Sequence, residues 1–294
     1  MTTLRTAEPS LRSRWLGRHL RASREDHGFT LRYVERTLGV PYAEIKAAEQ
    51  GAHLLQVSQV AAVLELYGVC DKEERDLLLE LARDVRHLHR WENHVDAPLL
   101  TPAMLDFLWL ESQARFIRCY SATLVPDLLQ LPDYAEAVAQ QRIGPTAFPR
   151  EAAWWGWACE ERQRVLSGSP QATIRAVVAE AALHRPPGRV AGVLRRQLHL
   201  LAERSTWPHI SLQVLPASAS YLPGMDTSFA VFDLGQPRGS VATVHGLTDP
   251  TIHEERCAAQ YGQAFEQLSQ AALDSAASAA VIAEAAERSP KREE

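Results

Sequence analysis

The sequence predicts a mainly helical fold, with a five-helix domain at the N-terminus followed by an α+β domain that has about four short strands. Two patterns lead to this expectation. Apolar residues, among them Leu20, Val34, Ile45 and Leu64, recur at helical spacing through residues 14–90, and glycines separate the runs. After residue 170, short runs rich in Val, Ile and Phe alternate with helical segments, which is typical of a mixed domain. We therefore expect domains at 1–90 and 101–285, a linker at 91–100 and a frayed tail at 286–294.

The five N-terminal helices are expected between glycines and capping residues. Gly28, Gly39 and Gly51 each follow a helical run, where glycine can adopt the left-handed conformation that ends a helix. Thr30 can accept a hydrogen bond from the first amides of the second helix, and Asp71 can do the same for the fifth. The expected helices lie at about 14–26, 31–38, 41–50, 56–67 and 72–85.

Two of these helices, 31–38 and 41–50, are separated by a glycine turn inside a packet of about 65 residues. This layout is typical of a helix-turn-helix that reads DNA. A small helical packet used only for protein contacts would show the same pattern. The spacing alone does not separate these two interpretations.

The remainder of the chain begins with helical patterns and then changes character. Helices with proline or capping residues near their starts are expected at about 102–111, within 124–142, and at 150–166. Strands are expected at Ala172–Val178, Ile210–Leu215, Ser228–Leu234 and Ser240–Val244. A helix at about 189–204 separates the first two strands, and an Ala-rich helix ends the domain. Between them, Thr251-Ile252-His253-Glu254 resembles a capping box that opens a helix to about Leu273.

The net charge of −5 is unevenly distributed along the chain. Residues 1–36 contain 8 Arg against 4 acidic residues, so the acidic total does not exclude a polyanionic partner at this end. The four cysteines are scattered without a Cys-x-x-Cys pair, as expected of reduced thiols in the cytosol. No apolar run reaches the ~18 residues of a membrane span, and the N-terminus lacks the apolar core of a signal peptide. We therefore expect a cytoplasmic protein with no membrane partner.

Several stretches resemble known proteins. The segment LGRHLRASREDHGFTLRYVERTLGVPYAEIKAAEQG resembles the Cro/repressor-like, or XRE-type, helix-turn-helix. Farther along, LVPDLLQLPDYAEAV, ERQRVL, VVAEAALHRPPG, ISLQVLP and SFAVFDL are similar to the C-terminal domain of actinobacterial WhiJ-like regulators. The resemblance implies a transcriptional regulator that binds double-stranded DNA, usually as a homodimer. It also implies an antitoxin-like arrangement with a small protein from a neighbouring gene, and no established enzymatic role.

The resemblance further implies roles for residues of the N-terminal domain. Arg24 and Glu49 are implied to form a structural pair. The start of the second helix is implied to contact phosphate, and the third helix to read bases. The implied DNA-binding residues are Thr30, Arg32, Tyr42, Ala43, Glu44 and Lys46.

Two departures from the family pattern bear on base recognition. Thr30-Leu31 stands where such domains often have Ser-Gln, and Lys46-Ala47 stands where they often have Ser-Arg. Leu31 cannot donate a hydrogen bond to phosphate, and Lys46 is the one cation of the expected recognition helix. The sequence therefore predicts weak discrimination between bases, with phosphate contacts carrying most of the affinity.

The densest aromatic feature of the chain lies in the C-terminal domain. Trp154, Trp155 and Trp157 are three of the seven tryptophans and occupy four consecutive positions with Gly156. On a helix, Trp154 and Trp157 share a face, while Trp155 points about 100° away. Core packing, a small-molecule pocket and a partner helix each account for this cluster. His184 and His245 are further candidates for lining such a pocket.

Motifs for chemistry are absent from the sequence. It has no paired metal ligands at helical spacing, no phosphate-binding glycine loop and no nucleophile elbow. We therefore expect no cofactor, no metal site and no catalytic residue, although the sequence leaves open whether the protein is an enzyme.

Three functions are compatible with these observations. The favoured one is a DNA-binding regulator whose C-terminal domain dimerises and senses a small partner protein or a metabolite. The second is a relative whose DNA reader has decayed, leaving a small-molecule-binding or catalytic C-terminal domain. The third is an interaction module that a small partner protein titrates.

Overall fold

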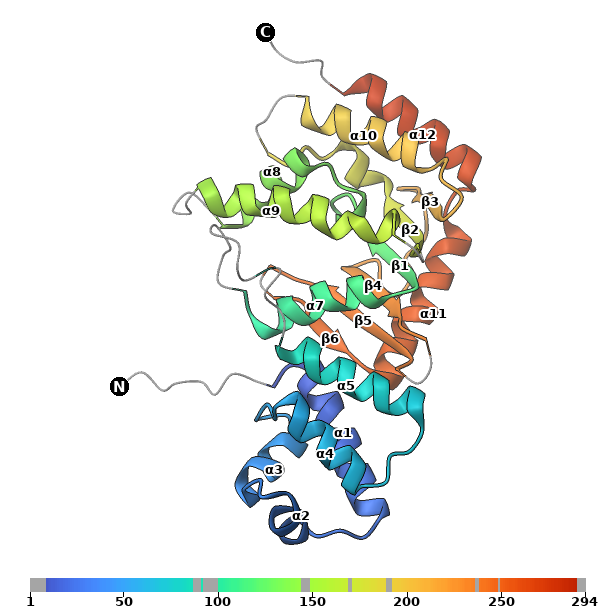
Figure 1. The fold of residues 1–294 in the computed structure, drawn as a ribbon. Helices are drawn as coiled ribbons and strands as arrows, with labels where there is room; N and C mark the ends of the chain where they lie inside the picture. The colour runs from blue at the N-terminus through green and yellow to red at the C-terminus, as the bar shows by residue number, and fades with distance from the viewer. Residues whose placement is uncertain are drawn as a thin grey trace, which may run out of the picture. The chain divides into compact units, whose positions relative to one another are not determined.

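A computed structural model describes residues 9–86, 91, 100–143, 149–168, 171–188, 192–235, 238–247 and 249–289 (Figure 1). The chain forms two compact units. The first contains the described residues up to Asp106, and the second contains those from Phe107 onward. Most of the expected linker, 92–99, and residues 290–294 of the expected tail lie outside the described residues. No described helix is long and apolar enough to cross a membrane.

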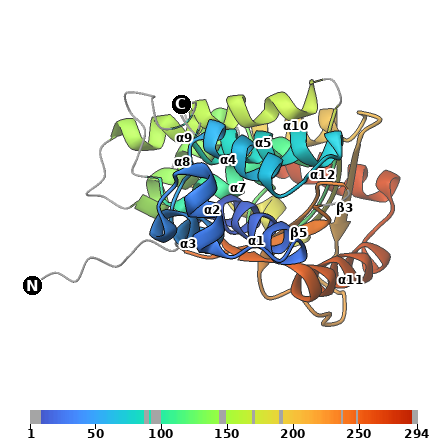
Figure 2. The same ribbon diagram turned by 60° about the horizontal axis from the view of Figure 1, so that its bottom comes forward.

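The first unit is a packet of short helices (Figure 2). They are α1 (Leu11–Asp26), α2 (Leu31–Leu38), α3 (Tyr42–Glu49), α4 (Val57–Leu66) and α5 (Lys72–Arg86). The expected boundaries are present, because Thr30 caps the start of α2 and Gly39 ends it in the left-handed conformation. Asp71 likewise accepts a hydrogen bond from the Glu74 amide at the start of α5, at 2.8 Å. The predicted five-helix layout is confirmed.

The core of this unit consists of the apolar positions that helical spacing predicted. Leu20 of α1, Val34 of α2, Ile45 of α3 and Leu64 of α4 are all buried. Burying one such side chain contributes about 1.5–3 kcal/mol. Helices this short are marginal alone in water, so this shared core is what keeps them folded.

The second unit is built on a six-stranded sheet with the order β3-β2-β1-β4-β5-β6. Its strands are β1 (Phe116–Ser121), β2 (Thr173–Ala179), β3 (Ile210–Leu215), β4 (Ser228–Asp233), β5 (Ser240–His245) and β6 (Thr251–His253). β1, β2 and β3 are parallel, whereas β1–β4, β4–β5 and β5–β6 are antiparallel pairs. The carboxyl end of β1 therefore lies at the same edge as the paired residues Ser228 and His245.

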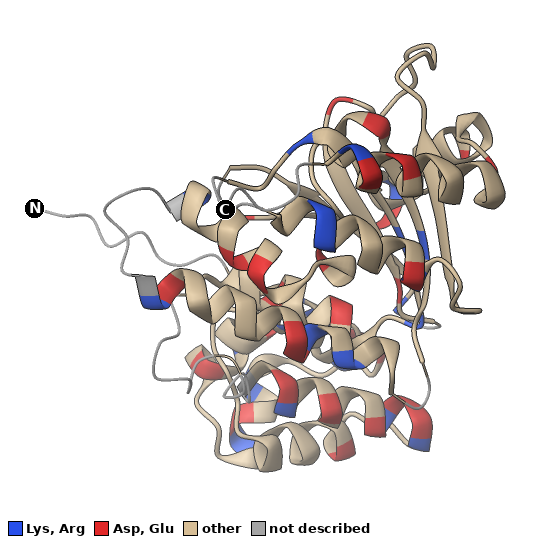
Figure 3. Ribbon diagram, turned by 90° about the horizontal axis from the view of Figure 1, so that it is seen from above, with Lys and Arg blue, Asp and Glu red and all other residues tan. Residues whose placement is uncertain are grey.

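Helices cover both faces of this sheet. α8 (Pro132–Ile143), α9 (Pro149–Arg162) and α10 (Val193–Arg204) lie in the crossovers between parallel strands, and right-handed crossovers place them on one face. α11 (Glu255–Ala271) lies along the opposite face, and α12 (Ser275–Arg288) packs against α10 and β3 (Figures 1 and 2). α7 (Pro102–Gln113) precedes β1. Figure 3 shows basic and acidic residues interspersed along the described helices.

Alternation along the strands divides the sheet residues between two environments. Tyr120, Phe229, Val231 and Ala242 are buried in one cluster with Phe265 of α11. The intervening positions of the same strands point to the opposite face, since successive side chains of a strand alternate. That second face borders the cavity described below.

The predicted fold class is confirmed, but the sheet has two strands that were not predicted. In β1, Arg118 interrupts the apolar run FIRCYS, although in the structure its guanidinium reaches Glu266 of α11 at 3.5 Å. The predicted capping box at residues 251–254 is wrong, because Thr251–His253 pairs with β5 as β6. α11 begins only at Glu255, after strand pairing has used the backbone groups of the preceding segment.

Candidate functional site

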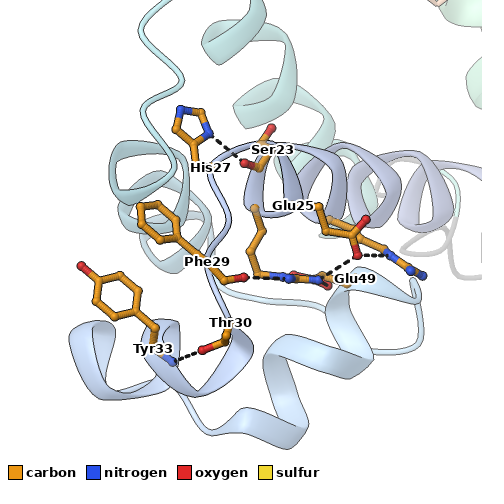
Figure 4. Close-up of polar contacts among 9 residues, drawn as sticks. Ser23, Glu25, His27, Phe29, Thr30, Tyr33 and Glu49 are labelled. Atoms are coloured by element: carbon orange, nitrogen blue, oxygen red, sulfur yellow. Dashed lines mark hydrogen bonds and ion pairs between the residues drawn. The ribbon is translucent and has the colours of Figure 1, made fainter.

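The α2–α3 pair is tied to α1 by one bidentate ion pair (Figure 4). Arg24 of α1 donates from Nε and Nη2 to the two carboxylate oxygens of Glu49 at the end of α3, at 2.6 and 2.9 Å. Its Nη1 donates to the carbonyl oxygen of Phe29 in the turn before α2, at 2.9 Å. The hydrogen bond with Glu49 raises the pKa of Arg24. One guanidinium thus connects α1, the turn and α3, and it joins the two residues that the resemblance paired.

α1 and α3 also approach each other closely enough to exclude a side chain. A Cβ atom at Gly17 would lie 2.6 Å from the carbonyl oxygen of Ala48 and 2.7 Å from that of Glu49. Both oxygens belong to the backbone of α3, which cannot rotate away as a side chain can. The placement of α3 on α1 therefore depends on Gly17 as well as on Arg24.

Gly17→Ala is expected to destabilise the first unit by about 1–3 kcal/mol, the range for overpacking a core. Urea unfolding of the full chain, followed by far-UV circular dichroism, measures the loss. Ala22→Gly is the matched control, because Ala22 is an exposed position of the same helix. There glycine should be the worse residue by about 0.5–1 kcal/mol. A stabilising Gly17→Ala, as helix propensity alone would give, would contradict the close contact.

Side chains also cap the starts of both helices. Thr30 Oγ1 accepts a hydrogen bond from the Tyr33 amide at 3.2 Å and keeps its hydroxyl hydrogen as a donor. Glu35 of α2 accepts from the Tyr42 amide at the start of α3, at 2.9 Å. Glu35 was not predicted as a functional residue, because it lies seven positions before the amide that it caps. Capping signals in a sequence are read over about three residues.

The outer side of α3 is accessible to solvent. Tyr42, Ala43 and Lys46 are exposed, and Arg32 of α2 holds its guanidinium 5.9 Å from the centre of the Tyr42 ring. Glu44 is half-buried, and its carboxylate lies 3.8 Å from Nε2 of His53. This side of the α2–α3 pair therefore offers two cations, an aromatic ring and one carboxylate.

The tryptophan cluster lies on α9, partly in the core. Trp154 is buried, and its ring centre lies 4.9 Å from that of Trp155 and 6.0 Å from that of Trp157. Trp155 and Trp157 are half-buried. His184 is exposed at the end of the short helix η3 (Glu180–His184). The three tryptophans and His184 are not among the described residues that line the cavity beside His245, which is described next.

A cavity of about 170 Å³ lies at the carboxyl end of β1. Its lining comes from α7, β1 and the following loop, η1 (Asp127–Leu129), the start of β4 and the end of β5. His245 lines the cavity, whereas the three clustered tryptophans and His184 are not among its described lining residues. Glu111, Asp127 and Arg142 also line it, and no sequence motif pointed to them.

Beside this cavity, Arg162 of α9 bridges two acids. Its Nε and Nη2 donate to the two carboxylate oxygens of Glu111, at 2.7 and 2.8 Å. Nη2 also donates to Asp127 at 3.1 Å. The Arg162 and Glu111 side chains are only 7% and 5% exposed, so these charges are buried. One cation thus joins α7, η1 and α9 around the cavity.

Two parts of the chain match known families. Residues 104–284 match a family described as Domain of unknown function (DUF5753). The chain belongs to the DUF5753 family. Residues 15–78 match a family described as Helix-turn-helix domain, a range that includes Arg24, α2, α3 and Glu49. This helix-turn-helix domain supports a DNA-binding regulator. No curated protein and no solved structure matches the chain significantly.

Burial sets the protonation states around the cavity of the DUF5753 domain. It raises the pKa of the Cys119 thiol to about 12, and the nearby Asp127 and Glu111 carboxylates act in the same direction. Burial lowers the pKa of His245, a shift that the charge of Asp127 opposes. At neutral pH the DUF5753 cavity therefore presents a protonated thiol and a neutral imidazole. Within the described residues, no cluster of three potential metal ligands occurs.

Proposed function

We propose that the chain is a cytoplasmic transcriptional regulator that binds double-stranded DNA through α2 and α3. The observation that carries this proposal is the α2–α3 pair itself, held on α1 by Arg24 and Glu49 with Lys46 on its exposed side. A recognition helix must be held rigidly while its outer side chains reach base edges in the major groove. The intact helix caps and core packing of this domain argue against the alternative, in which the helix-turn-helix has lost DNA binding.

The exposed residues suit distinct parts of a DNA contact. Lys46 can donate to the acceptors of guanine, and Glu44 can accept from the amino group of cytosine. Arg32 and the hydroxyl of Thr30, at the start of α2, can contact phosphate, which positions the protein without reading sequence. With one lysine on the reading helix, we propose that phosphate contacts supply most of the affinity. The logarithm of the binding constant should then fall by about 0.9 per contact for each tenfold rise in salt.

Lys46→Glu is expected to weaken DNA binding about tenfold or more, because a cation at the base edges becomes an anion. Fluorescence anisotropy with a duplex taken from upstream of the protein's own gene, between about 50 and 200 mM salt, measures it. Lys72→Glu is the matched control: it makes the same change of charge at an exposed position that begins α5. It should alter the affinity less than about threefold, since Lys72 lies outside the α2–α3 pair and an exposed charge acts only through a solvent-screened field.

Two results would contradict the DNA-binding proposal. One is equal binding by the wild type, Lys46→Glu and Lys72→Glu. The other is no binding to any duplex from the region, even at about 50 mM salt, where phosphate contacts are strongest.

For the DUF5753 domain we propose dimerisation and the sensing of a small partner protein or a metabolite. Helix-turn-helix readers commonly bind as dimers, because two half-sites one helical turn apart match the two-fold symmetry of the protein. Light scattering of the full chain on its duplex tests the dimer: the expected protein mass is twice the 32.7 kDa of one chain. One chain per duplex would remove dimerisation from the proposal and leave DNA binding intact.

A further inference from the structure

We infer that the cavity at the carboxyl end of β1 binds a ring-sized organic monoanion, such as a small aromatic carboxylate. The inference extends the proposed function by naming the chemical class that the DUF5753 domain would sense. Binding to the cavity can be measured without DNA, so the two proposals can fail separately.

The position of the cavity is the first argument. The chain leaves β1 toward β2 on one side, whereas β4 lies on the other side of β1. In open α/β sheets, ligands bind outside the carboxyl ends of strands at the point where the connections diverge. Cys119 and Ser121, at the end of β1, and residues 123–129 that follow all line the cavity.

The size and walls of the cavity fit a single ring. Its volume of about 170 Å³ is close to the roughly 150 Å³ of an engineered apolar cavity in another protein that accepts benzene. Phe107, Ile117 and Phe232 contribute to the lining. The rings of Phe107 and Phe232 meet edge-on at 6.0 Å between centroids. Flat apolar bodies pack well against such walls, because aromatic rings prefer offset or edge-to-face contacts.

The charged groups of the cavity favour a negative ligand end. Both oxygens of Glu111 accept hydrogen bonds from Arg162, and those of Asp127 accept from Arg162 and from Gln130. Arg142 is exposed and lines the cavity, and it has no hydrogen-bond or ion-pair partner among the described residues.

A ligand carboxylate therefore meets a guanidinium that is available for two parallel hydrogen bonds. The charges of Arg142 and Arg162 balance those of Glu111 and Asp127, so the two acids do not exclude an anion. A ligand ammonium group would instead be repelled by Arg142, and the carboxylates of Glu111 and Asp127 already accept hydrogen bonds from other side chains. His245, Ser121 and Thr123 add neutral hydrogen-bonding groups to the lining.

Buried amide side chains hold the loop that forms the cavity wall. Gln130 donates from Nε2 to the Val125 carbonyl oxygen at 2.8 Å. Gln197 of α10 donates to the Leu129 carbonyl oxygen at 2.7 Å and accepts from the Leu131 amide at 2.6 Å. A wall ordered in this way loses little conformational entropy when a small ligand binds, which favours affinity from few contacts.

The test uses the full chain and three probes of one shape, namely benzoate, benzamide and benzylamine. Isothermal titration calorimetry gives each affinity, and thermal unfolding gives an independent readout, because a ligand of the folded state raises the midpoint. We expect benzoate to bind roughly tenfold more tightly than either of the other two, since only benzoate forms a charge-assisted pair with Arg142.

Three variants assign the binding to the cavity. Arg142→Ala should weaken benzoate roughly tenfold and leave benzamide unchanged, because the neutral probe does not use the charge. Arg164→Ala is the control: its side chain is 69% exposed and Arg164 is not among the described lining residues, so all three affinities should stay the same. Ala230→Leu fills the cavity and should abolish binding of all three probes, with circular dichroism verifying that the domain is folded.

Several outcomes would overturn the inference: no binding of benzoate to the wild type, equal affinity for all three probes, or a preference for benzylamine. An equal loss of benzoate and benzamide in Arg142→Ala would overturn it as well. A protein that binds benzoate but no DNA would contradict only the proposed function. One that binds DNA but not benzoate would contradict only this inference.

Discussion

Arg162→Met is expected to destabilise the DUF5753 domain by about 3–5 kcal/mol, the cost of removing one partner from a buried ion pair. Methionine fills a similar length without charge, so Glu111 and Asp127 lose the donors that lie 2.7–3.1 Å from their oxygens. Water cannot replace those bonds well, because the Glu111 side chain is only 5% exposed. Urea unfolding of the full chain followed by tryptophan fluorescence measures the loss.

The loss of unfolding free energy in Arg162→Met should depend on pH. At Glu111, burial raises the pKa and Arg162 opposes the shift. At Asp127, burial raises the pKa, but the charges of Arg162, His245 and Arg142 outweigh it and the pKa is lowered. Without Arg162, the folded-state pKa of each acid rises, and that of Glu111 lies further above its unfolded value. An acid with a raised folded pKa contributes stability below its unfolded pKa and loses it as pH rises through the folded pKa. The deficit should therefore be larger at about pH 7.5 than at about pH 5.

Two further variants separate the buried pair from a general effect of losing arginine. Arg164→Met removes an arginine whose side chain is 69% exposed and paired with Glu161, which should cost less than about 1 kcal/mol. Adding Glu111→Gln to Arg162→Met should recover part of the stability, because it removes one of the two unbalanced charges. Equal losses in Arg162→Met and Arg164→Met at neutral pH would contradict the assignment.

The fold of the helix-turn-helix domain was predictable because the residues that cap and pack its helices act locally. Thr30, Gly39 and Asp71 each act within a few residues, and helical spacing alone identified Val34 and Ile45 as core positions. By contrast, the resemblance, and not the helical pattern, pointed to Arg24 and Glu49, because 25 residues separate the two partners. Glu35 escaped both routes, since a cap supplied from a neighbouring helix leaves no short sequence signature.

The cavity was not predictable, because it forms only when distant segments meet. Glu111, Asp127 and Arg162 come from α7, η1 and α9, which are far apart in the sequence, and no spacing pattern links the three charges. Strand β1 carries much of the lining, but Arg118 masked its apolar pattern. His245 was singled out from the sequence, yet its surroundings depend on pairing between β4 and β5. The chemistry of each side chain could be inferred from the sequence. Their meeting at one cavity could not, because it depends on the strand order and on the crossovers of the sheet.

Asp106→Leu is expected to destabilise the first unit by about 3–5 kcal/mol, because it removes the carboxylate that pairs with a buried guanidinium. Asp106 accepts from Arg12 Nε at 2.7 Å and from the Leu11 amide at 2.5 Å, and both charged side chains are 1% exposed. Arg12 also donates to the Asp84 carbonyl oxygen at 2.9 Å, so the pair joins the start of α1 to α5. Urea unfolding monitored by far-UV circular dichroism measures the change. Glu25→Leu on the surface of α1 is the control and should cost less than about 1 kcal/mol.

The double variant Arg12→Met/Asp106→Leu decides what the Arg12–Asp106 pair contributes. Removing both charges ends the desolvation penalty, so the double variant should be more stable than Asp106→Leu alone. If the double variant is as stable as the wild type, the attraction between the charges only offsets the cost of burying them. The pair then adds no net stability and instead fixes the position of the start of α1 relative to Asp106. A double variant less stable than Asp106→Leu would mean that Arg12 contributes mainly through Asp84 and its packed stem, which would contradict a dominant ion pair.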